Sequence, residues 1–297
     1  MRPGGFSPRR PKIEKKKHCI GRRDVLTCEQ EEIGTSDTHF FWERGMRKLA
    51  AVVLLASVVA YASAAWFDSF DSYSLGSING QGGWVGWANT PSAAGTVTDI
   101  ISRSPGQSQQ IEYGHDSVHT YAGYNTGVWW YTAYVWIPND FQSGGVPPDT
   151  GTYFILLNTY TNGGANTRWS VQFSFDSADG LIHADAGHNT EVTLPYSVDM
   201  WSEIAVRIDL TNDWTQVYYN GTLIDDPDVP NHPTLGGGYQ WTKGVFGTDT
   251  NGLLNVAAVD LYANGSTPVY YDDMSLAVPE PVAGLLALAL AALARRR

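Results

Sequence analysis

Residues 201–224 read WSEIAVRIDLTNDWTQVYYNGTLI, and their pattern indicates antiparallel strands joined by a hairpin. Between residues 201 and 210 apolar side chains alternate with polar ones, which is the period of a strand with one buried face. The second half places Asn220-Gly221 between two strand-like arms. Asn-Gly is a strong hairpin signal because both turn positions require positive φ. This stretch therefore predicts antiparallel β structure packed on a core.

Two other stretches show the same period of two. In GVWWYTAYVWIP, residues 127–138, the side chains expected in the core are Trp129, Tyr131, Ala133, Val135 and Ile137, and those expected outside are Trp130, Thr132, Tyr134 and Trp136. In RWSVQFSF, residues 168–175, one side is expected to carry Trp169, Val171, Phe173 and Phe175, and the other Arg168, Ser170, Gln172 and Ser174. Both stretches are aromatic and β-branched, as strands are.

The span 65–278 is long enough for one sizeable domain and contains no segment with the composition of a linker. It holds ten Trp, fifteen Tyr and seven Phe, separated by glycine- and asparagine-rich breaks roughly every ten residues. No long helical period is present. These features predict an all-β fold in which two antiparallel sheets form a sandwich.

The same span is strongly acidic. It contains four Lys or Arg residues and 22 Asp or Glu residues, so its formal charge is −18. Such a surface repels phosphate backbones, which argues against nucleic-acid binding, and it favours neutral over anionic polysaccharides as partners. Both cysteines, Cys19 and Cys28, lie outside the span, so no disulfide is expected within it.

Residues 46–65, MRKLAAVVLLASVVAYASAA, have the layout of a secretory signal peptide. Two basic residues precede an apolar run and an Ala-x-Ala cleavage pattern. We therefore expect a signal helix over 46–64. Because signal peptides act at the N-terminus, we interpret residues 1–45 as an upstream extension from a mis-assigned start. The alternative is a disordered basic arm.

The end of the chain, residues 277–297, combines a Pro-Glu-Pro motif, an apolar run and an arginine cluster. The run Val282–Ala294 has 13 residues, whereas a membrane-spanning helix needs about 20. The arginines behind it resist translocation. A short hydrophobic helix that holds the chain at the inner membrane only transiently accounts for this arrangement.

This ending resembles the PEP-CTERM sorting signal of Gram-negative bacteria. The matching residues are Pro279, Glu280, Pro281, the apolar run, and Arg295, Arg296 and Arg297. The resemblance implies processing by the protease exosortase, passage through the export machinery, and a destination at the cell surface, the outer membrane or the extracellular matrix. The sorting signal is then residues 277–297.

The body is similar to the concanavalin A-like, or LamG-type, jelly rolls. The resemblance covers most of residues 65–276 and rests on the stretches FDSYSLGSINGQGGWVGW (70–87), SGGVPPDTGTYFILLNTY (143–160), 201–221 and VYYDDMSLAVPEP (269–281). It implies two packed antiparallel sheets, one of them concave. Lectins, carbohydrate-binding modules, hydrolases and lyases share this fold, so the fold alone does not identify the function.

Sugar binding is expected from aromatic side chains on an exposed strand face. Sugar rings stack their apolar faces on aromatic rings, and neighbouring polar groups bind the hydroxyls. The expected glycan-binding residues are Trp130, Tyr134, Trp136, Arg168 and Gln172. The alternative is that these rings belong to the core.

Catalysis is less well supported by the sequence. The Glu-x-Asp-x-x-Glu run usual in hydrolases of this fold is absent, and Glu203 and Asp209 are about 20 Å apart along a strand. The densest polar cluster, in LIHADAGHNTEV (181–192), offers His183, Asp185, His188 and Glu191. A solvated strand edge is the favoured interpretation of that cluster, so no catalytic residue is assigned.

Acidic pairs near both ends of the domain suggest a structural calcium ion. The terminal strands of such jelly rolls pair side by side, and calcium binds clusters of oxygen ligands. The expected ligands are Asp68, Asp71, Asp272 and Asp273. A plain solvated surface is the alternative.

Three functions follow from the sequence. The first is an exported, non-catalytic, lectin-like surface or matrix protein that binds a glycan. The second is a glycan-active hydrolase or lyase, and the third is a structural biofilm or adhesion component that binds no sugar.

Overall fold

The computed structural model describes residues 18–22, 25–29, 66–144, 151–188 and 190–278. The chain divides into two units, residues 1–63 and 64–297. The predicted signal peptide, 46–64, lies outside the described residues, and so does the predicted sorting signal, 277–297, except for its first two residues. In the parts of the chain that are described, no helix has the length and apolar character needed to cross a bilayer.

The first unit contains one antiparallel pair, β1 (His18–Arg22) and β2 (Val25–Glu29). Its register sets Cys19 opposite Cys28. The sequence pattern predicts no strand in residues 1–45, so this pair is a feature that the pattern misses.

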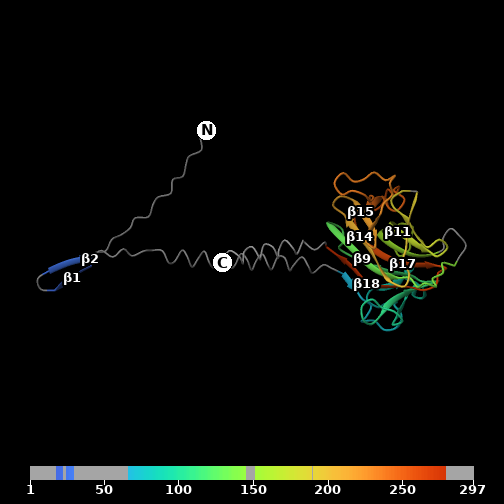
Figure 1. The fold of residues 1–297 in the computed structure, drawn as a ribbon, viewed down its shortest axis with the longest axis horizontal. Coiled ribbons are helices and arrows are strands. Elements are labelled where there is room, and N and C mark those ends of the chain that lie inside the picture. The colour runs from blue at the N-terminus through green and yellow to red at the C-terminus, as the bar shows by residue number, and fades with distance from the viewer. Residues whose placement is uncertain (1–17, 23–24, 30–65, 145–150, 189, 279–297) are drawn as a thin grey trace. The chain divides into compact units, whose positions relative to one another are not determined.

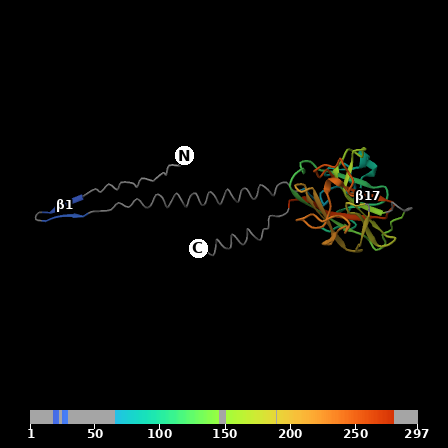
Figure 2. The ribbon, with the colours of Figure 1, turned by 90° about the horizontal axis from the view of Figure 1, so that it is seen from above.

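The second unit is an all-β sandwich of two antiparallel sheets, drawn in two views in Figures 1 and 2. The seven-stranded sheet has the order β13 (Glu191–Pro195), β12 (Leu181–Asp185), β11 (Arg168–Asp176), β10 (Gly151–Thr159), β17 (Ala258–Asn264), β8 (Asp116–Thr120) and β5 (Trp84–Gly86). The nine-stranded sheet has the order β16 (Thr222–Ile224), β15 (Trp214–Tyr219), β14 (Trp201–Asp209), β9 (Val128–Trp136), β18 (Val269–Ala277), β7 (Ser108–Ile111), β6 (Thr96–Thr98) and β4 (Gly76–Ser77), with β3 (Trp66–Asp68) paired to β18. The predicted fold class is confirmed.

Short turns of 3-10 helix complete the unit. They are η2 (Trp87–Asn89), η3 (Pro91–Ala93) and η4 (Trp241–Lys243). The first and last strands of the sandwich, β3 and β18, lie side by side, as expected for the two ends of a jelly roll.

Local sequence explains the central strands of the nine-stranded sheet. β9 alternates between half-buried and buried residues along its whole length, with Trp129, Tyr131, Ala133 and Val135 in the core. β14 and β15 are the two strands predicted from residues 201–219. The Asn220-Gly221 turn joins β15 to β16 with positive φ at both positions, 46° and 76°. The predictions for these segments are confirmed.

The prediction for residues 168–175 is wrong at one position, because β10 and β11 are joined through two bulges. Leu156 pairs with Val171, but the next pair is Leu157 with Trp169, so Ser170 is an extra residue on β11. A second shift makes Asn158 an extra residue on β10. The offset turns Trp169 away from the core and onto the outer face of the sheet, where it packs with the cluster that contains Ile155 and Leu157.

The two extra residues are tied to each other. Asn158 Nδ2 donates to Ser170 Oγ at 2.8 Å, and this hydroxyl donates to the Trp241 carbonyl at 2.8 Å. Tyr239 also donates to the Ser170 carbonyl at 2.9 Å. Asn158, Ser170 and Trp241 are fully buried, so these bonds are sheltered from water.

Replacing Ser170 with alanine is expected to destabilise the sandwich. The change leaves the Asn158 amide and the Trp241 carbonyl short of a buried partner, at a cost of about 1–3 kcal/mol. Urea unfolding followed by tryptophan fluorescence measures the loss. Ser174→Ala on the half-exposed side of the same strand is the control, expected within about 0.5 kcal/mol of the parent. Equal midpoints for the parent and Ser170→Ala would contradict this account of the bulge.

Candidate functional site

The outer face of the seven-stranded sheet carries a row of aromatic side chains. Tyr153 on β10 pairs across to Tyr262 on β17, and their rings stack at 5.6 Å with an interplanar angle of 28°. Trp169, turned outward by the bulge, lies across from Leu157, further along β10 beyond the row of Ile155. Side chains of β10, β11 and β17 therefore form an aromatic floor that faces away from the core.

Trp87 covers one side of this floor from η2. Its ring stacks with that of Trp169 at 6.4 Å and 26°, and it meets Tyr160 edge-on at 5.2 Å. The Ala88 amide donates to the Tyr160 hydroxyl at 3.2 Å, which fixes η2 to the end of β10. The turn η2 is thus fixed against the end of β10 and against Trp169 of the bulged strand β11.

These side chains line an elongated depression that we call the aromatic groove. Its acidic half has a volume of about 330 Å³ and is lined by Trp87, Asp116, Tyr153, Ile155, Trp169, Gln172, Asp260, Tyr262 and Asn264. Its basic half has a volume of about 380 Å³ and is lined by Arg168, Trp169, Gln172, Lys243, Gly244, Val245, Phe246, Thr248 and Asp249. Trp169 and Gln172 belong to both halves, so the two are continuous.

Asp116 and Asp260 form a carboxyl pair in the acidic half. Burial raises the pKa of Asp116 to about 6, and the hydrogen bond with Asp260 only partly opposes this shift. Burial raises the pKa of Asp260 well above its usual range, and the charge of Asp116 and their hydrogen bond add to the rise. Near neutral pH the pair therefore holds a proton, because two adjacent carboxylates at a buried site repel each other.

The basic half contains two of the four basic residues of the sandwich. The Arg168 guanidinium lies 3.3 Å from Asp249 and donates to the carbonyls of Ala165 and Thr167. Among the described Lys and Arg residues of the sandwich, Lys243 is the one that enters no ion pair. The groove thus offers an unpaired ammonium group at one end and a proton-holding carboxyl pair at the other.

The structure separates the predicted glycan-binding residues into two groups. Arg168 and Gln172 line the aromatic groove, whereas Trp130, Tyr134 and Trp136 lie on β9, on the outer face of the opposite sheet. The expectation that all five share one surface is therefore corrected. It fails because β9 and β11 belong to different sheets, which the alternation within each strand does not reveal.

The three rings on β9 face outward as predicted, but each has protein partners. The Arg103 guanidinium lies 3.5 Å from the centre of the Tyr134 ring, and the Tyr134 hydroxyl donates to Glu203 at 3.1 Å. The Trp130 ring lies 5.9 Å from that of Tyr218, and Trp136 meets Trp201 edge-on at 5.9 Å.

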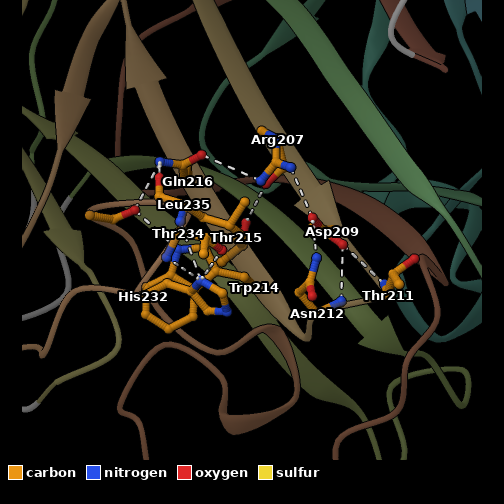
Figure 3. Close-up of polar contacts among 11 residues, drawn as sticks. Arg207, Asp209, Thr211, Asn212, Trp214, Thr215, Gln216, His232, Thr234 and Leu235 are labelled. Carbon is orange, nitrogen blue, oxygen red and sulfur yellow. Dashed lines mark hydrogen bonds and ion pairs between the residues drawn. The ribbon is translucent and has the colours of Figure 1, made fainter.

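Polar groups beside Trp130 are also bound to one another, as Figure 3 shows. Arg207, directly across from Trp130, donates to Asp209 at 2.8 Å and lies within 3.5 Å of Gln216. Burial acts to raise the pKa of Asp209, but hydrogen bonds from Asn212 and Arg207 outweigh it and lower the pKa. This face consists of mutually satisfied contacts.

The four predicted calcium ligands accept hydrogen bonds from the protein. Asp68 is buried and accepts from the Phe70 amide at 2.9 Å, the Tyr73 hydroxyl at 2.6 Å and the Trp84 indole at 2.8 Å. Asp71 accepts from the Gln107 amide at 2.9 Å.

The other two carboxylates, those of Asp272 and Asp273, are bound by Arg103. Its amide donates to Asp272 at 2.6 Å, and its guanidinium pairs with Asp273. These contacts explain the acidic pairs at the ends of the domain as acceptors that fix the terminal strands, and a calcium ion bound by the four stays a prediction.

The cluster His183, Asp185, His188 and Glu191 lies at the edge of the seven-stranded sheet. Burial acts to lower the pKa of His183, but hydrogen bonds to Glu191 at 2.7 Å and Asp179 at 2.9 Å raise it overall. Asp185 accepts from Gln172 at 3.2 Å, and burial raises its pKa. Asp185 thus connects this edge to the aromatic groove.

Sequence patterns miss several groove residues. Asp260 lies in VAAVDLYA, residues 256–263, where one carboxylate interrupts an apolar run, and this interruption is the signal that could have found it. Asp116, 144 residues earlier, gives no local signal. The two meet only because β8 and β17 are neighbours in the sheet.

Comparisons with known proteins find solved structures of similar fold. No protein-family model matches the sequence, and no curated protein matches it. Among solved structures, a sialidase is similar at 10% identity and a TM-score of 0.46, covering 74% of this chain, which spans only 19% of the sialidase.

Two further solved structures are similar over nearly their whole length. The catalytic domain of a glycoside hydrolase family 131 protein from Coprinopsis cinerea has 14% identity, covers 72% of this chain and 93% of its own, and has a TM-score of 0.41. The Emp47p carbohydrate recognition domain has 10% identity, covers 74% and 97%, and has a TM-score of 0.38. At these identities the likeness concerns the arrangement of strands and says nothing about ligands.

The carboxyl pair predicts a dependence of stability on pH. Because the pKa of Asp116 is about 6 in the folded protein and near 4 in an unfolded chain, its contribution is full below pH 4 and is lost as the pH rises through 6. Asp116→Asn should reduce the loss of unfolding free energy between pH 4 and 7.5 by on the order of 1–2 kcal/mol. Urea unfolding at several pH values measures this.

Two features make the test specific. Asp272, whose pKa burial also raises to about 6, contributes equally to the parent and to the variant. Exposed Asp140→Asn is the matched control and should keep the parent's pH profile. Identical profiles for the parent and Asp116→Asn would show that the pair is not titrating in this range.

Proposed function

We propose that the protein is an exported surface or matrix protein whose sandwich binds a neutral saccharide in the aromatic groove. The observation that carries the proposal is the combination of outward-facing rings and polar groups in one depression. Trp87, Trp169, Tyr153 and Tyr262 offer ring faces and edges for the apolar sides of sugar rings. Specific polar groups among mainly apolar walls are typical of small-ligand sites.

The polar groups of the groove suit hydroxyl ligands. The protonated carboxyl pair can donate as well as accept hydrogen bonds, and the side-chain amide of Gln172 can do both. Sugar hydroxyls likewise donate and accept. A neutral ligand also fits the formal charge of −18 on residues 65–278, which repels polyanions.

A second candidate, a glycan-active hydrolase, is favoured by the two carboxyl groups in the groove. Hydrolases of this kind hold their carboxyl groups about 5–10 Å apart so that the scissile bond and a water molecule fit between them. Asp116 and Asp260 are in direct hydrogen-bond contact, which leaves no such space. The geometry therefore favours binding over hydrolysis.

Sorting forms the other part of the proposal. We infer export through the signal peptide at 46–64 and processing by exosortase at Pro279-Glu280-Pro281, from the sequence pattern. The inner membrane is then a transient partner, and the outer surface of a Gram-negative cell or its matrix is the destination. An acidic sandwich without disulfides, able to bind polysaccharide, is suited to that location.

Alanine at Trp87 and Trp169 should abolish retention on polysaccharide. The matched control is Trp130→Ala with Trp136→Ala, two tryptophans on the opposite face, which should bind like the parent. Pull-down of the full-length protein on cellulose, xylan, mannan and galactan measures retention, and circular dichroism checks folding.

Release of reducing ends in the same samples tests the hydrolase alternative. Retention without release supports binding, whereas release that stops in Asp116→Asn would favour hydrolysis. Loss of binding in the Trp130 and Trp136 variant alone would place the site on the opposite face. Failure of every sample to bind would favour a structural component.

Processing predicts that the surface form of the protein lacks the end of the chain. Mass spectrometry of protein released from intact cells should find peptides up to about residue 278 and none ending in Arg297. Replacing Pro279 and Pro281 with alanine should retain the full-length form in the inner-membrane fraction. A surface protein that still ends in Arg297 would contradict the sorting proposal.

A further inference from the structure

The carboxyl pair of the acidic half has an unusual hydrogen-bond inventory. Asp260 is 3% exposed, and both it and Asp116 line the aromatic groove. Oδ1 of each is fully buried and, among the described residues, accepts no hydrogen bond from an amide, hydroxyl or other donor of the protein. A buried carboxylate oxygen without a partner is costly, so such atoms point to something that the protein is built to hold.

The polar groups that line this half are carboxylate, amide and phenol groups, without histidine or cysteine. Hard divalent cations such as calcium prefer oxygen ligands, whereas zinc and copper prefer sites with nitrogen or sulfur. The donor set therefore selects calcium or magnesium. Calcium tolerates irregular coordination, which fits a pair of carboxylates on two neighbouring strands.

The spacing of the pair also suits one ion. Oxygens that bind the same calcium ion at about 2.3–2.6 Å lie no more than about 5 Å apart. Carboxyl groups in direct hydrogen-bond contact meet this condition without a change of backbone. The pairs Val118–Asp260 and Asp116–Tyr262 lie two rungs apart in the β-ladder, so both aspartates stand on the same face of neighbouring strands.

We propose that Asp116 and Asp260 form a calcium-type divalent-cation site on the floor of the aromatic groove. Two carboxylates supply up to four of the six to eight oxygens that calcium takes. The remaining positions face the groove, where water fills them or sugar hydroxyls replace it. The role of sugar hydroxyls rests on the proposed function, whereas the ion site itself does not.

This site differs from the other acidic clusters of the sandwich. The four aspartates expected from the sequence accept bonds from amides, hydroxyls, an indole and a guanidinium, as described above. Two further acidic clusters each contain a histidine: one consists of Asp176, Asp179 and His183, the other of His188, Asp226 and Asp228. In each cluster the histidine is paired with an aspartate, His183 with Asp179 and His188 with Asp226. In the groove pair, unlike these clusters, both members are carboxylates with a buried oxygen to which no other described residue donates.

A cation at this position competes with the proton that the pair otherwise holds. The other titratable groups around the pair are the phenols of Tyr153 and Tyr262, which line the groove, and of Tyr160, whose pKa burial raises. The Lys and Arg side chains of the groove, Arg168 and Lys243, line its other half. Because the cation must displace this proton, binding should weaken as the pH falls.

Calorimetric titration of the full-length protein with calcium chloride, without sugar, tests the site. Extracellular calcium sites have dissociation constants of about 0.1–1 mM, and we expect a value in this range at pH 7.5 and at least tenfold weaker binding at pH 5. Asp260→Asn and, separately, Asp116→Asn should weaken binding at least tenfold. Asp179→Asn, in an exposed cluster, is the matched control and should leave it unchanged.

Three results would overturn the inference. They are the absence of heat and of any thermal shift at about 10 mM calcium, unchanged binding in both groove variants, and loss of binding in Asp179→Asn alone. Polysaccharide pull-down with calcium and with chelator is run in parallel. Retention of polysaccharide without calcium binding refutes the ion site and leaves the proposed function intact. Calcium binding without retention of polysaccharide supports the ion site and refutes the proposed function.

Discussion

The hydrogen bond between Asn158 and Ser170 fixes the geometry on which the candidate site depends. These residues are the extra members of two facing bulges, and burying their polar side chains requires that they satisfy each other and the Trp241 carbonyl. The resulting offset moves Trp169 from the core to the outer face, where it joins Trp87 and both halves of the groove. Without the offset, strict alternation would place this ring in the core with Val171.

The two outer faces of the sandwich have different chemistry although both are aromatic. On the nine-stranded sheet, Arg103 covers Tyr134, and Arg207 is bound to Asp209, so the polar groups are already satisfied. On the seven-stranded sheet, Asp116 and Asp260 each keep a buried oxygen to which no other described residue donates, and half-buried rings surround them. A binding surface needs polar groups that are free to hydrogen-bond a ligand. Among the residues described, the groove on the seven-stranded sheet offers such groups, whereas those on the nine-stranded sheet bind one another.

Sequence patterns predict the fold well because the relevant signals are local. Alternation over residues 127–137 identifies the buried and exposed sides of β9, and Asn220-Gly221 specifies the turn after β15. The site is predicted poorly because it depends on pairings between distant segments. Periodicity within a strand cannot reveal that β9 and β11 belong to different sheets, that a bulge reverses Trp169, or that Asp116 meets Asp260. The pattern groups Gln172 and Arg168 with the rings of β9, whereas both line the groove on the other sheet.

The central claim, that ligand binds the face carrying Trp87 and Trp169, is tested most directly by nuclear magnetic resonance. Each tryptophan has one indole N–H signal, which can be assigned by substitution and followed as a neutral oligosaccharide from the retained polysaccharide is added. We predict that the signals of Trp87 and Trp169 shift in a saturable way while those of Trp130, Trp136 and Trp201 stay in place. Shifts confined to Trp130, Trp136 and Trp201 would contradict the account and move the binding surface to the opposite sheet.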